Sequence, residues 1–449
     1  RARQLLMSRS YGVDNAIARI PKEQLSDPGL IYERAKWRRR AGLNDKAIEL
    51  LLNIPNKIPM PEAWWKEIRI HIRKQLSSGK IKNALHLAAN HKQNSSFNIA
   101  EAEWLAGWMS LRFLKDPRRA YEHFSVMSDT VSMPISTARA AYWAGKAAES
   151  LGDQTSAKHW FQRSAALTST FYGQLANHEL NKNVTIAKNV KIKNIEFKSF
   201  TNHSNVQALL ALNQANHYLS RRFAIHTAQI SKKPIELQNL NKLLGMIHRI
   251  DLQIAAAKKA TQNELYNPTL LFPIPDLSIY SIKIRDERVS LPMALAISRQ
   301  ESLFSAKAKS RAGALGIMQL MPRTAKLTSN LLKIPYSRNR LTTDPAYNIR
   351  LGTHYFGNLL EKYNGSYALA LAAYNAGPRR ANRWLKKFGD PRKEEIDPVD
   401  WVELIPIKET RNYVQRVIEG AQVYSSILPI NSTKNINFAA EMFSINKKF

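Results

Sequence analysis

The stretch LPMALAISRQES, residues 291–302, together with GALGIMQLMP, residues 313–322, decides the fold of the C-terminal third of this chain. Leu291-Pro292 predicts the start of a helix, because proline fits the first helical turn without losing a hydrogen bond. Four residues share one face of that helix: Met293, Ile297, Glu301 and Phe304. A carboxyl among apolar neighbours loses hydration, which raises its pKa, as a general acid near neutral pH requires. The alternative for Glu301 is a frayed helix end with a salt bridge to a Lys or Arg.

The charge of the chain favours a polyanionic partner. Lys and Arg number 67 against 35 Asp and Glu, a net charge of +32 over 449 residues. Nucleic acid, an anionic membrane and an acidic polymer such as a cell wall all fit such a surplus. The basic residues are spread along the chain without an arginine-rich tail, a zinc-finger pattern or an RNP-like strand that would favour nucleic acid specifically, so charge alone leaves all three partners open.

The composition predicts a folded protein of two to four domains, with 44% hydrophobic and 9% aromatic residues. No apolar run reaches the ~20 residues of a membrane helix, so no transmembrane segment is expected. The absence of Cys excludes disulfides, thiolate metal sites and a Cys nucleophile, and we expect no metal and no cofactor. The start at Arg1-Ala2-Arg3, without Met, suggests that an N-terminal segment has been removed.

Residues 1–190 predict a helical repeat domain. Four alanines recur at intervals of 37, 36 and 37 residues, each early in the second helix of a predicted pair: Ala47, Ala84, Ala120 and Ala157. This period is close to that of tetratricopeptide repeats, whose stacked helix pairs form a superhelix. We expect the tryptophans of this region to fill the stacked core rather than a ligand site: Trp64, Trp65, Trp104, Trp108, Trp143 and Trp160.

The rest of the chain divides at composition changes. Residues 182–204 are rich in Lys and Asn and lose the helical pattern, which returns between 206 and 263. Three prolines between 268 and 275 end that region. We therefore predict a small helical linker domain at 191–271, a catalytic domain at 272–430 and a tail at 431–449. Further helices are predicted near 276–288, 344–363, 367–375, 379–386 and 410–424. His217, His226 and His248 lack metal-ligand spacing and are expected to be ordinary surface or partly buried histidines.

Three blocks of the last domain indicate a glycosidic-bond site with a single acid. The first contains Glu301 and Gln319, whose amide suits an amide-bearing sugar, and Gly313 and Gly316 would let a ligand approach the main chain. The second is AAYNAGP, residues 372–378, and the third is IPIKETRNYV, residues 405–414. Ordinary glycosidases pair two carboxylates. Glu409 is the only second candidate, and its neighbours Lys408 and Arg411 predict a structural salt bridge and a supporting role.

Taken together, SRQES, GALGIMQLMP, AAYNAGP and ETRNYV resemble the soluble lytic transglycosylases of bacterial peptidoglycan. The resemblance covers about 275–428 and implies a lysozyme-like α-helical domain that cleaves the MurNAc-β-1,4-GlcNAc bond and leaves a 1,6-anhydromuramoyl end. It implies that Glu301 is the catalytic acid and then the base. It places six residues in the sugar groove: Ser310, Gln319, Met321, Tyr374, Asn375 and Glu409.

The family also implies an exported, periplasmic protein whose partner is the peptidoglycan glycan strand and not nucleic acid. Peripheral association with the envelope and a cell-wall enzyme complex are compatible with this setting. Two other functions remain open from the residues themselves. One is a lysozyme-type hydrolase that uses Glu301 with water. The other is a non-catalytic helical-repeat scaffold that binds an anionic polymer.

Overall fold

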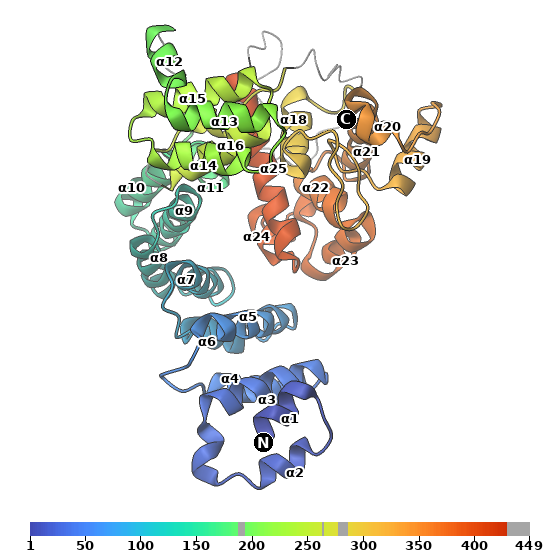
Figure 1. The fold of residues 1–449 in the computed structure, drawn as a ribbon. Helices are drawn as coiled ribbons and strands as arrows, with labels where there is room; N and C mark the ends of the chain where they lie inside the picture. Colours follow the sequence, from blue (N-terminus) through green and yellow to red (C-terminus); the bar gives the residue numbers. More distant parts are fainter. Residues whose placement is uncertain (187–193, 263–264, 277–285, 429–449) are drawn as a thin grey trace. The chain divides into compact units, whose positions relative to one another are not determined.

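The computed structural model describes residues 1–186, 194–262, 265–276 and 286–428 (Figure 1). Within these ranges the chain forms 25 α-helices, two short 3-10 helices and isolated β-bridges, with no strand. The predicted all-α class is confirmed. The chain divides into two compact units, Arg1–Ser164 and Ala165–Phe449. None of the helices in the described ranges is long and apolar enough to cross a lipid bilayer.

The first unit is a series of helix pairs. Its elements are α1 (Ala2–Ser8), α2 (Val13–Ala18), η1 (Lys22–Ser26), α3 (Pro28–Arg40), α4 (Asn44–Leu52), α5 (Pro61–Ser77), α6 (Ile81–Ala89), α7 (Ser96–Arg112), α8 (Pro117–Thr130), α9 (Pro134–Ser150) and α10 (Gln154–Ala165). The predicted repeat is confirmed, because the four alanines lie fully buried in α4, α6, α8 and α10, the second helices of their pairs. Small side chains at these positions let the paired helices approach closely.

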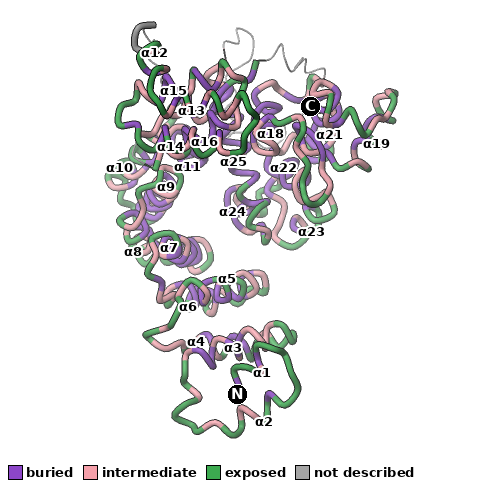
Figure 2. The backbone as a smooth tube through the Cα atoms, viewed as in Figure 1, coloured by how far each residue is buried: buried purple, intermediate pink, exposed green. Residues whose placement is uncertain are grey.

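Aromatic side chains fill the core of this unit, as expected. Trp64, Trp65, Trp104, Trp108 and Trp143 are all buried, and Trp104 stacks on Trp108 with ring centroids 5.2 Å apart. Trp160 is only half-buried, and its indole N–H donates to the Tyr121 hydroxyl at 3.0 Å. Buried residues are concentrated on α7 and α9 (Figure 2).

The second unit begins with a small helical region. It contains α11 (Phe171–Glu179), α12 (Asn194–Thr201), α13 (Ser204–Gln214), α14 (Ser220–Ile230), α15 (Pro234–Met246), α16 (Ile250–Thr261) and α17 (Pro268–Leu271). Leucines and alanines of α13 to α16 form one core, so the helical region predicted after residue 206 is confirmed. Helix α12 lies inside the stretch 182–204, so the prediction that this stretch is non-helical is wrong for residues 194–201. His217, His226 and His248 are exposed.

The remaining helices of this unit surround the candidate site. They are α18 (Leu291–Ser302), α19 (Pro322–Leu331), α20 (Arg340–Thr343), α21 (Pro345–Lys362), α22 (Tyr367–Ala376), α23 (Pro378–Phe388), η2 (Pro391–Lys393), α24 (Pro398–Leu404) and α25 (Lys408–Ile427). The helices predicted from 344, 367, 379 and 410 are confirmed to within a few residues. Helix α19 interrupts a stretch predicted as loop. The helix predicted at 276–288 falls mainly on residues outside the described ranges.

Helix α11 packs on the last helices of the second unit through buried carboxylates. The Tyr172 hydroxyl donates to Glu403 at 2.5 Å, and the backbone N–H of Phe171 donates to Glu419 at 2.9 Å. The side-chain amide of Gln174 donates to the backbone oxygen of Glu419 at 3.0 Å. The chain before residue 190 therefore contributes one helix to the support of α25. The four-part division at 190, 271 and 430 stays a prediction, and the tail 431–449 lies outside the described residues.

Candidate active site

Helix α18 carries Glu301 in its last turn, as predicted. The Ser290 hydroxyl caps the helix by accepting from the backbone N–H of Met293 at 3.4 Å. Met293 and Ile297 are completely buried on the face that also holds Glu301. Arg299 fixes the same end of the helix, because its guanidinium donates to the backbone oxygen of Leu271 at 2.8 Å. The helix that carries the Glu301 carboxyl is thus fixed by packing on several sides.

The chain turns sharply after Glu301. Leu303 and Phe304 both adopt left-handed backbone conformations, with φ of 53° and 64°, and the Phe304 ring is buried. The Ser302 hydroxyl, next to the catalytic candidate, donates to the backbone oxygen of Ile317 at 2.7 Å. The helix end is therefore closed by an ordered loop and is not frayed.

Burial determines the protonation of Glu301. Loss of hydration raises its pKa from 4.5 to about 7; a hydroxyl contact from Tyr413 lowers it, and the negative charge of Glu409 raises it further. Glu301 is half-buried, and no Lys or Arg among the described residues forms an ion pair with it. The predicted apolar setting is confirmed, and the alternative of a salt-bridged glutamate is wrong for this structure.

Two phenols lie beside this carboxyl. The charge of Glu301 and burial both raise the pKa values of Tyr374 and Tyr413 well above 10, with burial the larger cause, so both phenols stay neutral. Tyr374 donates to the backbone oxygen of Met318 at 2.8 Å. The buried Tyr413 hydroxyl makes no hydrogen bond of ordinary geometry, so its contact with Glu301 is a close approach rather than a formed bond.

Tyr413 was absent from the predicted site, although it lies inside the quoted block ETRNYV. It stands four residues after Glu409 on α25, and residues at that spacing share a helix face. This spacing is the signal by which Tyr413 could have been included.

Asn348 of α21 organises the loop between α18 and α19. Its side-chain oxygen accepts from the backbone N–H of Met318 at 2.9 Å, and its amide donates to the backbone oxygens of Leu315 and Leu341 at 3.0 Å. Gly316 has φ +79°, and a Cβ there would lie 1.9 Å from the Leu341 oxygen. The glycine is thus required by packing against the protein, which corrects the expectation that it leaves room for a ligand. Gly313, with φ +90°, has open space around it.

The predicted residues of this loop differ in their roles. The Gln319 amide nitrogen donates to the backbone oxygens of Gly316, at 2.8 Å, and Ala308, at 3.2 Å. Only the side-chain oxygen of Gln319 remains to accept a hydrogen bond from a ligand. We had expected the side-chain amide to offer a ligand both a donor and an acceptor. The exposed Ser310 hydroxyl accepts from the backbone N–H of Ala314 at 2.9 Å and so shapes the turn. Met321 is 44% exposed at the start of α19.

Asn375 and Glu409 lie at the ends of α22 and α25. The Asn375 side-chain oxygen accepts from the Thr410 hydroxyl at 2.6 Å, which joins the two helix ends. Glu409 is exposed and forms no ion pair with a described residue. The predicted salt bridge is wrong: Arg411 points inward, 3.6 Å from the buried carboxylate of Glu403. Glu409 therefore keeps its charge available near Glu301.

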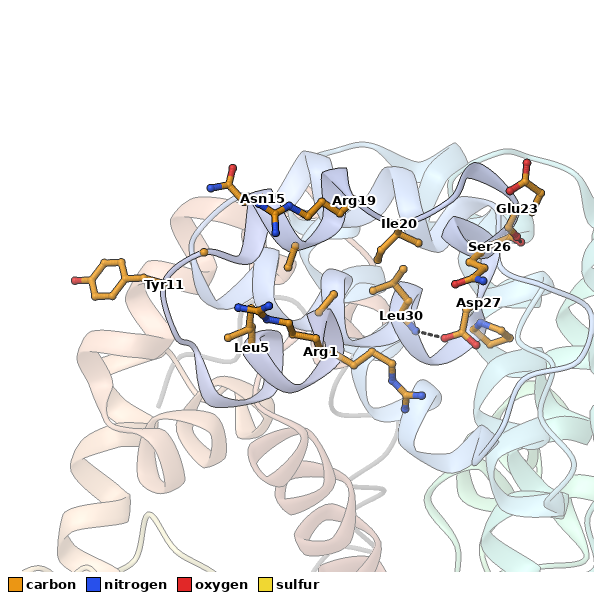
Figure 3. Close-up of a pocket in the computed structure, with 16 residues that line it drawn as sticks. Arg1, Leu5, Tyr11, Asn15, Arg19, Ile20, Glu23, Ser26, Asp27 and Leu30 are labelled. Atoms are coloured by element: carbon orange, nitrogen blue, oxygen red, sulfur yellow. Dashed lines mark hydrogen bonds between the residues drawn. The ribbon is translucent and has the colours of Figure 1, made fainter.

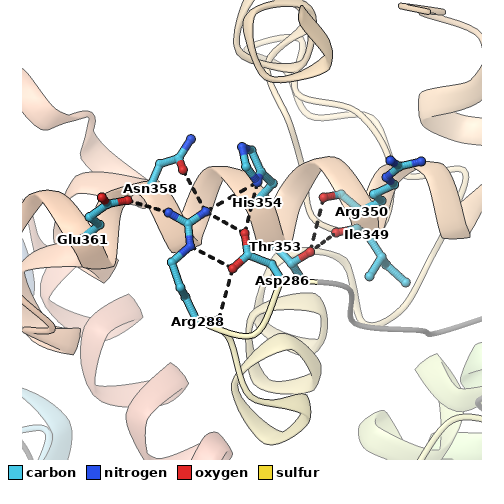
Figure 4. A network of polar contacts seen from close by, with 8 residues as sticks. All are labelled: Asp286, Arg288, Ile349, Arg350, Thr353, His354, Asn358 and Glu361. Atoms are coloured by element: carbon cyan, nitrogen blue, oxygen red, sulfur yellow. Dashed lines mark hydrogen bonds and ion pairs between the residues drawn. The ribbon is translucent and has the colours of Figure 1, made fainter. Parts of the chain in front are cut away.

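A polar network fixes the segment that leads into α18. The Arg288 guanidinium bridges Asp286, at 2.6 Å, and Glu361, at 2.7 Å, and donates to Asn358 at 2.9 Å (Figure 4). Asp286 also lies 3.1 Å from Nδ1 of His354. Because three of these residues belong to α21, the network ties the start of α18 to the helix that organises the loop.

A cavity of about 870 Å³ lies in the first unit, between α1, α2, η1 and α3 (Figure 3). Arg1, Arg19 and Glu23 line it, and Asp27 at its edge caps α3 by accepting from Leu30 at 2.7 Å. It contains none of the predicted site residues. No group of three His, Asp or Glu in the described part of the chain is arranged to hold a metal ion.

The part of the chain that contains Glu301 matches a known protein family. Residues 280–396 match the family model of the transglycosylase SLT domain. The soluble lytic murein transglycosylase of Salmonella typhimurium is 38% identical over 148 residues, which is 33% of this chain and 22% of that protein. A putative soluble lytic murein transglycosylase of Haemophilus influenzae is 40% identical over 139 residues, 31% of this chain and 23% of that protein. The matched region is thus less than a quarter of these relatives.

Solved structures resemble the fold over most of the chain. An inactive mutant of the lytic transglycosylase Slt of Pseudomonas aeruginosa superposes with a TM-score of 0.56 and 23% identity, covering 95% of this chain and 72% of that one. The 70-kDa soluble lytic transglycosylase of Escherichia coli gives 0.53 and 21%, covering 94% and 77%. These similarities show the fold.

Proposed function

We propose that this chain, whose residues 280–396 match the transglycosylase SLT domain family, is a lytic transglycosylase that cleaves the MurNAc-β-1,4-GlcNAc bond of peptidoglycan. The observation that carries the proposal is the state of Glu301. Its half-buried carboxyl has a pKa of about 7, no cation among the described residues pairs with it, and the neutral phenols of Tyr374 and Tyr413 interact with it. Such a carboxyl holds a proton near neutral pH and can give it up.

In the first step Glu301 donates its proton to the glycosidic oxygen. The bond between that oxygen and C1 of the muramoyl unit breaks, and positive charge develops at C1. A retaining glycosidase would supply a second carboxylate about 5 Å from the acid as nucleophile. In this chain the other carboxylate that interacts with Glu301 is that of Glu409, which is exposed and whose charge raises the pKa of Glu301. We assign it electrostatic support of the cation-like state, while the N-acetyl group of the substrate can shield C1.

In the second step the Glu301 carboxylate acts as a base. It takes the proton of the C6 hydroxyl of the same muramoyl unit, and the C6 oxygen bonds to C1. The product is a 1,6-anhydromuramoyl end, Glu301 regains its proton, and no water is consumed. Attack by a tethered hydroxyl is favoured because its translational entropy has already been lost.

The other predicted residues bind and position the sugar in this proposal. The free side-chain oxygen of Gln319 accepts from an N-acetyl N–H, and the exposed Met321 packs against a sugar face. Tyr374 holds the Met318 loop, and Asn375 joins α22 to α25. Ser310, which shapes the loop turn, contributes to the sugar groove in this proposal.

We further infer that the chain works in the periplasm on peptidoglycan glycan strands. The relatives that match about a third of this chain are named as soluble lytic murein transglycosylases, one of them as putative. The net charge of +32 is compatible with an anionic wall polymer.

Lysis of isolated sacculi by Glu301→Gln tests the proposal. We expect the loss of a general acid to reduce the rate of solubilisation by a factor on the order of 10²–10⁴. Glu287→Gln, which changes an exposed glutamate outside the site, should lyse sacculi like the unmodified chain. Sedimentation with sacculi should show that Glu301→Gln still binds. Unchanged lysis by Glu301→Gln would overturn the assignment of the acid.

A further inference from the structure

Helix α23 is unusually basic. Its 11 residues, PRRANRWLKKF, contain five Lys or Arg and no Asp or Glu. All five cations are exposed, and the side chains that anchor the helix are apolar, with Ala381 and Trp384 buried. The hydroxyl of Tyr363 also donates to the side chain of Asn382 at 2.8 Å. The helix therefore presents a fixed, positively charged face to solvent.

Helix stability explains only part of this charge. Lys386 and Lys387 stand in the last turn, where cations interact favourably with the helix dipole. Arg379 and Arg380 stand in the first turn, at the positive end of the dipole, where cations are unfavourable. Arg380 donates to the backbone oxygen of Ala376 at 3.3 Å, but Arg379 has no such contact. A role in folding thus accounts for Arg380 but not for Arg379.

Three of these cations form a row that has no partner in the part of the chain that the structure describes. Arg379, Arg383 and Lys386 are four and then three residues apart, so they share one helix face. None of the three forms an ion pair or a hydrogen bond with a described residue. The following acid, Asp390, is already paired with Arg392. The row is therefore available to an external anion.

The first residue of the row, Arg379, lies within a short length of chain of the candidate site. Helix α22 ends at Ala376, and Gly377, with φ +89°, turns the chain directly into α23. Arg379 follows Tyr374 by five residues, so their Cα atoms are separated by at most about 18 Å. Tyr374 itself lies within the electrostatic reach of Glu301. A peptide of four or five residues attached to a sugar at Glu301 has a similar reach.

We propose that Arg379, Arg383 and Lys386 bind the carboxylates of the peptide stem on the muramoyl unit. This rests on the proposed function, because the stem belongs to the substrate assigned there. The stem is an anionic peptide tethered beside the bond that Glu301 cleaves, and the continuity of α22 with α23 keeps Arg379 within chain reach of Tyr374. Binding to a membrane surface or to another wall polyanion would not require the cations to follow the site so closely along the chain.

Binding of the Glu301→Gln chain to sacculi, with and without their peptide stems, tests this inference. Stems are removed with an amidase, and affinity is measured by sedimentation at low salt. We compare the variant Arg379→Gln/Arg383→Gln/Lys386→Gln with a control that removes the same charge from the helical region before the site, Arg221→Gln/Arg222→Gln/Lys232→Gln. The three control cations are exposed.

On intact sacculi the α23 variant should lose affinity by a factor on the order of ten, the sum expected for three exposed ion pairs. On stem-free glycan it should bind like its parent, and the control should match the parent on both. Equal loss on both substrates, equal loss in the control, or a loss seen only with anionic lipid vesicles would each overturn stem recognition. The measurement requires no cleavage, so it stands apart from the sacculus-lysis test of Glu301.

Discussion

The substitution Glu301→Gln should stabilise the fold above pH 7 while it removes activity. A carboxylate whose pKa is raised from 4.5 to about 7 by burial is costly to ionise inside the folded chain. Glutamine has nearly the same shape and never ionises. The candidate acid is therefore a place where function and stability oppose each other.

The magnitude follows from linkage between protonation and folding. Between the unfolded pKa of 4.5 and the folded pKa of about 7, the folded state binds more protons than the unfolded state, so stability falls as pH rises. One pKa unit corresponds to about 1.36 kcal/mol, so a rise from 4.5 to about 7 gives roughly 3 kcal/mol for this group. The gain of Glu301→Gln over the unmodified chain should be near zero at pH 4.5 and reach that value above pH 7.

Urea unfolding at pH 4.5 and pH 8 measures this difference. Glu419 is also buried, with its pKa raised to about 7, but it is present in both chains and cancels in the comparison. Glu287→Gln removes an exposed glutamate and should change stability by less than about 0.5 kcal/mol at either pH. A gain for Glu301→Gln that is the same at both pH values would refute the reasoning.

The remaining predictions concern the pH profile and the loop. Glu409→Gln should move the alkaline limb of kcat/KM for sacculus lysis to lower pH, since the charge of Glu409 raises the pKa of Glu301. Tyr413→Phe should move that limb to higher pH, since the phenol lowers the same pKa, and a limb that stays in place in both variants would contradict these contributions. Gly316→Ala should reduce the free energy of unfolding by about 4 kcal/mol or more, because a Cβ would collide with a backbone oxygen 1.9 Å away. Gly313→Ala, which meets only the penalty of positive φ, should cost about 1–2 kcal/mol, and equal urea midpoints for the two variants would show that packing does not require Gly316.

Features with local causes were predicted from the sequence. The spacing of the alanines predicted the helix pairs, because a small residue is needed wherever two helices of a repeat meet. Leu291-Pro292 predicted α18, and Asp344-Pro345 predicted α21, whose cap is formed by Asp344 accepting from Tyr347 at 2.9 Å. Helix α19 escaped prediction although Met321-Pro322 starts it in the same way, because only Ala325, Thr328 and Ser329 are buried along it. A helix with so few buried apolar residues shows little of the periodic hydrophobic pattern from which helices are predicted.

Features that depend on contacts distant in sequence were not predicted. Adjacency suggested that Arg411 would pair with Glu409, but Arg411 lies beside the buried Glu403, which needs a cation more than an exposed carboxylate does. The amide of Gln319 is engaged by its own loop, a result of backbone oxygens that no side-chain pattern reveals. The raised pKa of Glu301, in contrast, followed from its place on an apolar helix face.

Mass spectrometry of the muropeptides released from sacculi in ¹⁸O-labelled water is the most direct test of the central claim. Attack by the tethered hydroxyl predicts anhydromuramoyl ends that carry no label. Labelled reducing ends would show that Glu301 activates water, and the chain would then be a hydrolase.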